Sequence, residues 1–222
     1  MSIFSNGLWI LLLIPLRLLA LVIHECAHGI VSTKLGDPTP RIQGRLTLNP
    51  LAHLDPFGTL LMILTGFGWA KPVEINPMYY KDRKKGMALV AFAGPLANFL
   101  LAFISVFLYG LFSVVLFKLN APQKLYNFIN YVFIYSAQIN LCFMVFNLIP
   151  IPPLDGSRIL GMFLSDKTYY TLMQYERYSM ILIMVLSLSG AFSAIISNGV
   201  GFFLDRMFSA VIPLFDMLMK WL

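Results

Sequence analysis

Long apolar stretches dominate this chain, and short polar segments separate them. A membrane-spanning helix needs about 20 mainly apolar residues. Stretches that meet or approach this length lie at 8–31, 87–117, 126–149, 179–197 and 199–221, the last two separated only by Asn198 and Gly199. With 222 residues, the chain has room for some six such helices. The pattern predicts an α-helical integral membrane protein with about five to six transmembrane helices.

The segment between the first two long stretches differs from the rest. Prolines and glycines interrupt it repeatedly between Pro38 and Pro77, and its parts 45–48 and 69–73 are typical of extended chain. Basic residues flank its apolar part, 57–69, on both sides. Because basic residues gather on the cytoplasmic side of a membrane, both flanks are expected there. We therefore predict a re-entrant, partly β segment, which is tolerated at depth where protein buries it or water reaches it.

Composition supports a membrane protein without a separate soluble domain. Hydrophobic residues make up 59% of the chain, charged residues 12%, and the mean hydropathy is +0.78, whereas soluble domains carry roughly 25% charged residues. We expect one membrane-embedded domain over 1–222, with its core at 8–165 and C-terminal helices at 177–221. The net charge of +6 is spread over the loops, which indicates contact with the lipid bilayer and no nucleic-acid partner.

A candidate metal motif lies inside the first apolar stretch, where the sequence reads His24-Glu25-Cys26-Ala27-His28. Residues four apart share one face of a helix, so His24 and His28 can bind one zinc ion while Glu25 reaches a water molecule on it. Ionisable residues inside a membrane helix are costly and usually functional. The motif therefore predicts hydrolysis within a bilayer, with Glu25 as the catalytic base.

A catalytic zinc usually has three protein ligands and one open position, so a third ligand is needed. Asp155 is the first candidate, because prolines end the 126–149 helix before it and Gly156 gives the backbone freedom to turn the carboxylate inward. His53 is the second candidate. An ordinary loop or helix-capping role for Asp155 is the alternative.

The chain resembles the site-2 protease family of intramembrane zinc metalloproteases in its compact bacterial form, without appended soluble domains. The resemblance rests on the HECAH motif, on Gly94-Pro95-Leu96-Ala97-Asn98 and on the NLIPIPPLDG segment that begins at Asn147. It implies one zinc per chain, with His24, His28 and Asp155 as ligands and Glu25 as general base. It also implies that Asn147 contacts the substrate backbone, and it assigns no role to His53 or Asp55.

The expected activity is endoproteolysis in or near transmembrane segments of membrane protein substrates. Such a helix must unwind before its peptide bonds can react, and the 40–75 segment could hold it by strand pairing, unless this segment is only a polar connection. The charge pattern places the site on the cytoplasmic side, and we expect a bacterial cytoplasmic membrane. The alternatives are a catalytically silent metal-binding regulator, a transporter and a lipid-modifying metalloenzyme.

Overall fold

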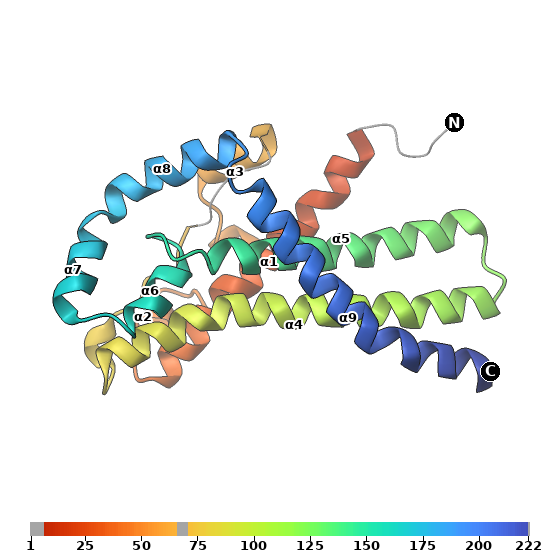
Figure 1. Cartoon of the computed structure of the whole chain (residues 1–222), viewed down its shortest axis with the longest axis horizontal. Coiled ribbons are helices and arrows are strands. Elements are labelled where there is room, and N and C mark those ends of the chain that lie inside the picture. The colour runs from red at the N-terminus through yellow and green to blue at the C-terminus, as the bar shows by residue number, and fades with distance from the viewer. Residues whose placement is uncertain (1–6, 66–70, 222) are drawn as a thin grey trace.

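A computed structural model describes residues 7–65 and 71–221 of the chain, and it is almost entirely helical (Figure 1). The helices are α1 (Gly7–Lys34), α2 (Thr39–Ile42), α3 (Pro56–Thr65), α4 (Arg83–Lys118), α5 (Gln123–Asn147), α6 (Asp155–Gly161), α7 (Asp166–Gln174), α8 (Glu176–Leu188) and α9 (Ser193–Trp221). Short 3-10 turns lie at Pro50–Ala52 and Pro77–Tyr79. The chain is thus a helical protein, as the sequence predicts.

Three helices are long and apolar enough to cross a membrane: Ile14–Lys34 within α1, the whole of α4 and the whole of α5. These match the first three predicted spans. The bent pair α8 and α9 would make a fourth, so the predicted total of five to six spans is not confirmed.

The break near the C-terminus lies elsewhere than predicted. Asn198 and Gly199 are inside α9, whereas the chain bends by 78° between α8 and α9. Gly190, in this bend, has a φ of +75°, which favours glycine. Gly199 instead lets α9 approach α5, since a Cβ there would lie 2.9 Å from Val145 Cγ1. Gly199 is therefore a packing position, and Gly190 lies at the helix break.

The segment between α1 and α4 contains no assigned β-strand among the described residues, so its predicted partly β character is not confirmed. Residues 45–48 and 71–73 are irregular. Helix α3 has 10 residues, about 15 Å at 1.5 Å per residue, which is too short to cross a hydrocarbon core of about 30 Å. Re-entry of 57–69 stays a prediction, because part of this stretch lies outside the described residues.

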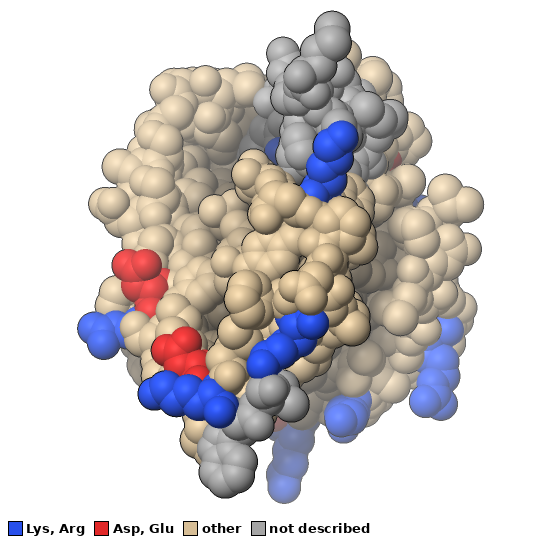
Figure 2. Space-filling model, turned by 90° about the vertical axis from the view of Figure 1, so that its right-hand side faces the viewer, with Lys and Arg blue, Asp and Glu red and all other residues tan. Residues whose placement is uncertain are grey.

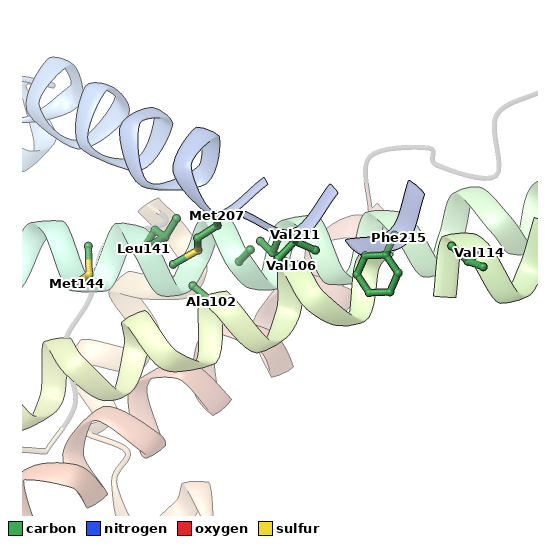
Figure 3. Close-up of a cluster of buried hydrophobic side chains, with 9 residues drawn as sticks. Ala102, Val106, Val114, Leu141, Met144, Met207, Val211 and Phe215 are labelled. Atoms are coloured by element: carbon green, nitrogen blue, oxygen red, sulfur yellow. The ribbon is translucent and has the colours of Figure 1, made fainter. Parts of the chain in front are cut away.

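Helices α4 and α5 form a long antiparallel pair, and α9 crosses over them (Figure 1). Apolar side chains from all three helices meet in a buried cluster (Figure 3), made of Ala102, Val106, Val114, Ala137, Leu141, Met144, Met207, Val211 and Phe215. Such burial of apolar side chains against each other fixes the relative position of helices. The α4–α5 pair therefore forms a firm support against which α1 packs.

The end of α1 and the start of α4 meet at one end of the bundle, on the left in Figure 1. Ser32 Oγ is 2.7 Å from Asp37 Oδ2 and 2.7 Å from Tyr80 Oη. Asp37 Oδ2 also accepts a hydrogen bond of 2.7 Å from the backbone N–H of Asn76. Asp37 is fully buried, so it anchors the segment before α4 to the end of α1.

Candidate metal centre

The structure brings together the three residues that the sequence suggests as zinc ligands. His24 and His28 lie one turn apart on α1, and Asp155 is the first residue of α6. One potential ligand atom from each lies within 4.8 Å of the others. Asp155 Oδ2 is 3.2 Å from His24 Nε2 and 3.4 Å from His28 Nε2.

The second ring nitrogen of each histidine has a partner that defines the tautomer. His28 Nδ1 lies 2.7 Å from the carbonyl oxygen of Val90, which can only accept, so Nδ1 carries the proton. His24 Nδ1 lies 2.6 Å from Asn98 Oδ1, which is also an acceptor. In the neutral rings, both Nε2 atoms therefore present a lone pair to the space in front of Asp155.

Three electron-pair donors thus face one another in a buried site. His24 is 6% and His28 is 9% exposed, and Asp155 Oδ2 is buried without a hydrogen-bond partner among the described residues. Two neutral imidazoles and an ionised carboxylate are a donor set that suits a catalytic zinc ion.

The position of Asp155 depends on a close approach between α6 and the end of α5. A Cβ on Gly156 would lie 2.3 Å from the carbonyl oxygen of Leu148 and 2.6 Å from that of Ile149. The need for glycine here is therefore steric, and its φ is not in the left-handed region. This corrects the expectation that Gly156 serves by backbone freedom.

Glu25 lies beside the three candidate metal ligands in a cavity of about 700 Å³. Its Oε2 accepts a hydrogen bond of 2.9 Å from the backbone N–H of Val73. Val73 and Asn147 line the same cavity, and Asn147 Nδ2 donates to the carbonyl oxygen of Phe143 at 3.0 Å. The candidate base and the candidate substrate-binding residue therefore open onto one space.

His53, the rival third ligand, lies outside this cluster. It is fully buried, and its Nε2 is 2.9 Å from the carbonyl oxygen of Thr47 and 3.8 Å from Cys26 Sγ. Cys26 thus faces the segment after α2, away from the metal ligands. His53 therefore packs within the segment between α2 and α3 and does not join the candidate ligands.

Sequence reasoning missed two groups near the site, the backbone of Val73 and Asn140, whose Oδ1 accepts a hydrogen bond of 2.9 Å from Asn98 Nδ2 behind His24. Asn140 is an amide inside an apolar helix, a costly placement that usually marks function and that could have drawn attention to it. A backbone N–H leaves no such signal in a sequence. Its contact with Glu25 depends on how the chain folds between α3 and α4.

A family model described as "Peptidase family M50" matches residues 12–190, which is most of the chain. The chain belongs to peptidase family M50. The resemblance to site-2 proteases is thereby confirmed. No solved structure matches this M50 chain significantly.

Several curated proteins are similar to this M50 member. "Putative zinc metalloprotease YwhC" of Bacillus subtilis (strain 168) is 40% identical over 78% of the chain and 80% of the relative. "Putative zinc metalloprotease Rip2" of Mycolicibacterium smegmatis is 30% identical over 78% of the chain and 65% of the relative. "Zinc metalloprotease MJ0392" of Methanocaldococcus jannaschii is 27% identical over 77% of the chain but only 39% of the relative.

Proposed function

We propose that this protein is an intramembrane endopeptidase that hydrolyses peptide bonds in or near transmembrane segments of membrane proteins. It is a zinc metalloprotease of family M50. The observation that carries the proposal is the convergence of His24, His28 and Asp155 inside a bundle of helices long and apolar enough to span a membrane. One zinc ion per chain matches this single set of ligands among the described residues.

Each residue of the site has a role in this proposal. Bound zinc supplies Lewis-acid chemistry, because it acidifies water and polarises a carbonyl group. Glu25 is the general base that takes a proton from the attacking water and then returns it to the leaving amine. The N–H of Val73 holds the Glu25 carboxylate by a hydrogen bond of 2.9 Å. This bond keeps Glu25 directed into the cavity.

The substrate is a membrane protein whose helix unwinds at the cleaved bond, since helical carbonyls are already hydrogen-bonded. The cavity of about 700 Å³ offers space for a short extended segment, and Val73 and Asn147 line it. We assign Asn147 to the substrate backbone, because an amide can both donate and accept.

We place the active site on the cytoplasmic side of a bacterial cytoplasmic membrane. Basic residues gather at the end of the bundle where α1 ends and α4 begins, including Lys34, Arg41, Lys81, Arg83, Lys84 and Lys85. The opposite end faces the viewer in Figure 2, which shows a mostly uncharged surface with scattered basic side chains and fewer acidic ones. This asymmetry supports a cytoplasmic position for the basic end.

A test compares wild type with Glu25→Gln in detergent, using a panel of tagged single-span substrates. Zinc content is measured for both proteins, and wild type is also assayed after chelation. We expect one zinc per chain in both proteins, and cleavage only by zinc-loaded wild type, with a loss of at least 100-fold in the variant, as for a missing general base. A wild type that holds zinc and cuts nothing would favour the silent regulator or the transporter. Cleavage by Glu25→Gln at the wild-type rate would contradict the mechanism.

A further inference from the structure

Behind the metal ligands, a row of polar groups crosses the interior of the bundle. Asn98 on α4 and Asn140 on α5 are 0% and 1% exposed, and Ser105 and Ser136 are also buried. The two serine Oγ atoms are 2.9 Å apart. Polar groups buried among apolar helices are costly unless they are hydrogen-bonded, and this row is connected from α5 to His24 on α1.

One face of α4 carries the groups that orient the two imidazoles and leave space for them. Val90, Gly94 and Asn98 follow one another at intervals of four residues and so share a helix face. The Val90 carbonyl accepts from His28, and Asn98 Oδ1 accepts from His24. Between them, Gly94 leaves space for both rings.

The two histidines are held by different kinds of group. The Val90 carbonyl that orients His28 belongs to the backbone and can only accept. The amide of Asn98 that orients His24 could turn by 180° and present Nδ2 instead. His24 therefore needs something that fixes the orientation of Asn98.

Hydrogen bonds on the far side of Asn98 from His24 fix the orientation of its amide. Asn140 Nδ2 donates to the carbonyl oxygen of Ser136 at 2.8 Å, which leaves Asn140 Oδ1 as an acceptor. Asn98 Nδ2 then donates to Asn140 Oδ1 at 2.9 Å and to the carbonyl oxygen of Ala20 at 3.0 Å. Only Oδ1 of Asn98 remains for His24, so two backbone carbonyls determine which way the amide faces.

We infer that Asn98, oriented by Asn140, is a positioning residue that keeps the proton of His24 on Nδ1 and its Nε2 free for metal. The inference rests on the proposed zinc site. Partners behind metal-binding histidines fix the ring and its tautomer, and their loss typically weakens metal affinity by about 10- to 100-fold. Asn98 therefore acts on the metal through His24, and Asn140 acts through Asn98.

The test measures zinc affinity by competition with a chelator, together with the visible spectrum of the cobalt-substituted protein. Asn98→Leu removes the acceptor, and we expect zinc to bind about 10- to 100-fold more weakly with an altered cobalt spectrum. Asn98→Asp keeps an acceptor for His24 Nδ1 but loses the Nδ2 donor to Ala20 and Asn140, so we expect a smaller loss of affinity than in Asn98→Leu. Asn140→Leu should give a smaller loss than Asn98→Leu, because the Ala20 carbonyl still orients the amide.

Asn130→Leu is the matched control, since Asn130 also joins α5 to α4, by a 3.0 Å hydrogen bond from Ser113 Oγ, but does not contact a metal ligand. It should leave zinc affinity unchanged. Equal zinc affinity of Asn98→Leu and wild type would overturn the inference. Equal losses of affinity in Asn98→Asp and Asn98→Leu would also overturn it, because a role of Asn98 in helix packing alone predicts that result. Asp155→Ala separates the two claims: unchanged zinc binding in this variant would overturn the metal site itself.

Discussion

At the scale of single residues, the proposed metal centre needs a glycine at position 94 as well as its three candidate ligands. A Cβ on Gly94 would lie 2.5 Å from His24 Cε1 and 2.5 Å from His28 Nε2. These distances are shorter than any van der Waals contact allows, so a side chain here must displace the imidazoles. Gly94 therefore shapes the space that both histidines occupy.

We predict that Gly94→Ala weakens zinc binding by at least about tenfold, because metal affinity depends on the orientation of its ligands. Competition with a chelator measures the loss. Gly201→Ala is the control, since a Cβ at Gly201 on α9 meets no atom within 4 Å. Zinc affinity that is the same in Gly94→Ala and Gly201→Ala would contradict the steric role.

The sequence best predicts those site residues that a fixed spacing in a motif links to one another. His24 and His28 are one helical turn apart, and their motif names Glu25 as well. Asp155 is 127 positions after His28, too far for any spacing to join it to them. It was a candidate because of the prolines and glycine around it, and the resemblance to a family supported that choice. The contacts of Asn98 and Val73 depend on how helices pack, which no local pattern encodes.

At the scale of elements, the connection from α1 to α4 is held by a buried carboxylate. Asp37 Oδ1 accepts a hydrogen bond of 2.9 Å from the N–H of Thr39, and its Oδ2 accepts from Asn76 and Ser32. Asn76 is three positions after Val73, whose N–H binds Glu25. The same carboxylate therefore supports the segment that holds Glu25, the proposed catalytic base.

This arrangement predicts a stability that depends on pH. Burial raises the pKa of Asp37, but the hydrogen bonds from Asn76, Thr39 and Ser32 outweigh it and hold the pKa below its ordinary value of 3.8. A depressed pKa in the folded state stabilises above the unfolded pKa, and this stabilisation is lost as the pH falls through the folded value. The contribution of Asp37 should be complete at neutral pH and decline below about pH 4.

Thermal unfolding in detergent, followed from pH 7 to pH 3, tests this for wild type and Asp37→Asn. We expect the variant to be less stable at pH 7 by about 1–3 kcal/mol, as for lost hydrogen bonds to a charged group. The difference between the two proteins should shrink below pH 4. A difference that stays constant over the whole range would contradict the role of the ionised carboxylate.

Elements were predictable where hydrophobicity alone defines them. The apolar stretches that became α1, α4 and α5 are continuous, so their helices follow from length and composition. The helix break near the C-terminus was misplaced, because Gly190 and Gly199 look alike in sequence and only the packing of α9 against α5 distinguishes them. The irregular 45–48 and 71–73 segments have strand-like composition, but no strand forms in their described residues.

At the scale of the whole molecule, the fold brings a polar site to the interior of an apolar bundle. Helix α4 carries the acceptors for both histidines, α1 carries the histidines and Glu25, and α6 carries Asp155. The site lies between the basic end of the bundle, where α1 ends and α4 begins, and the long apolar part of α4 and α5. This placement leads to the central claim, which is that the protein cuts its substrate within or beside a membrane-spanning segment.

The most direct measurement is to map the cut by mass spectrometry. Zinc-loaded protein is reconstituted in liposomes with a single-span substrate, and Glu25→Gln is treated in parallel. The account predicts new termini within the spanning segment or at its cytoplasmic edge, present with wild type and absent with Glu25→Gln. New termini found only in soluble regions far from the membrane, or the same termini with both proteins, would contradict it.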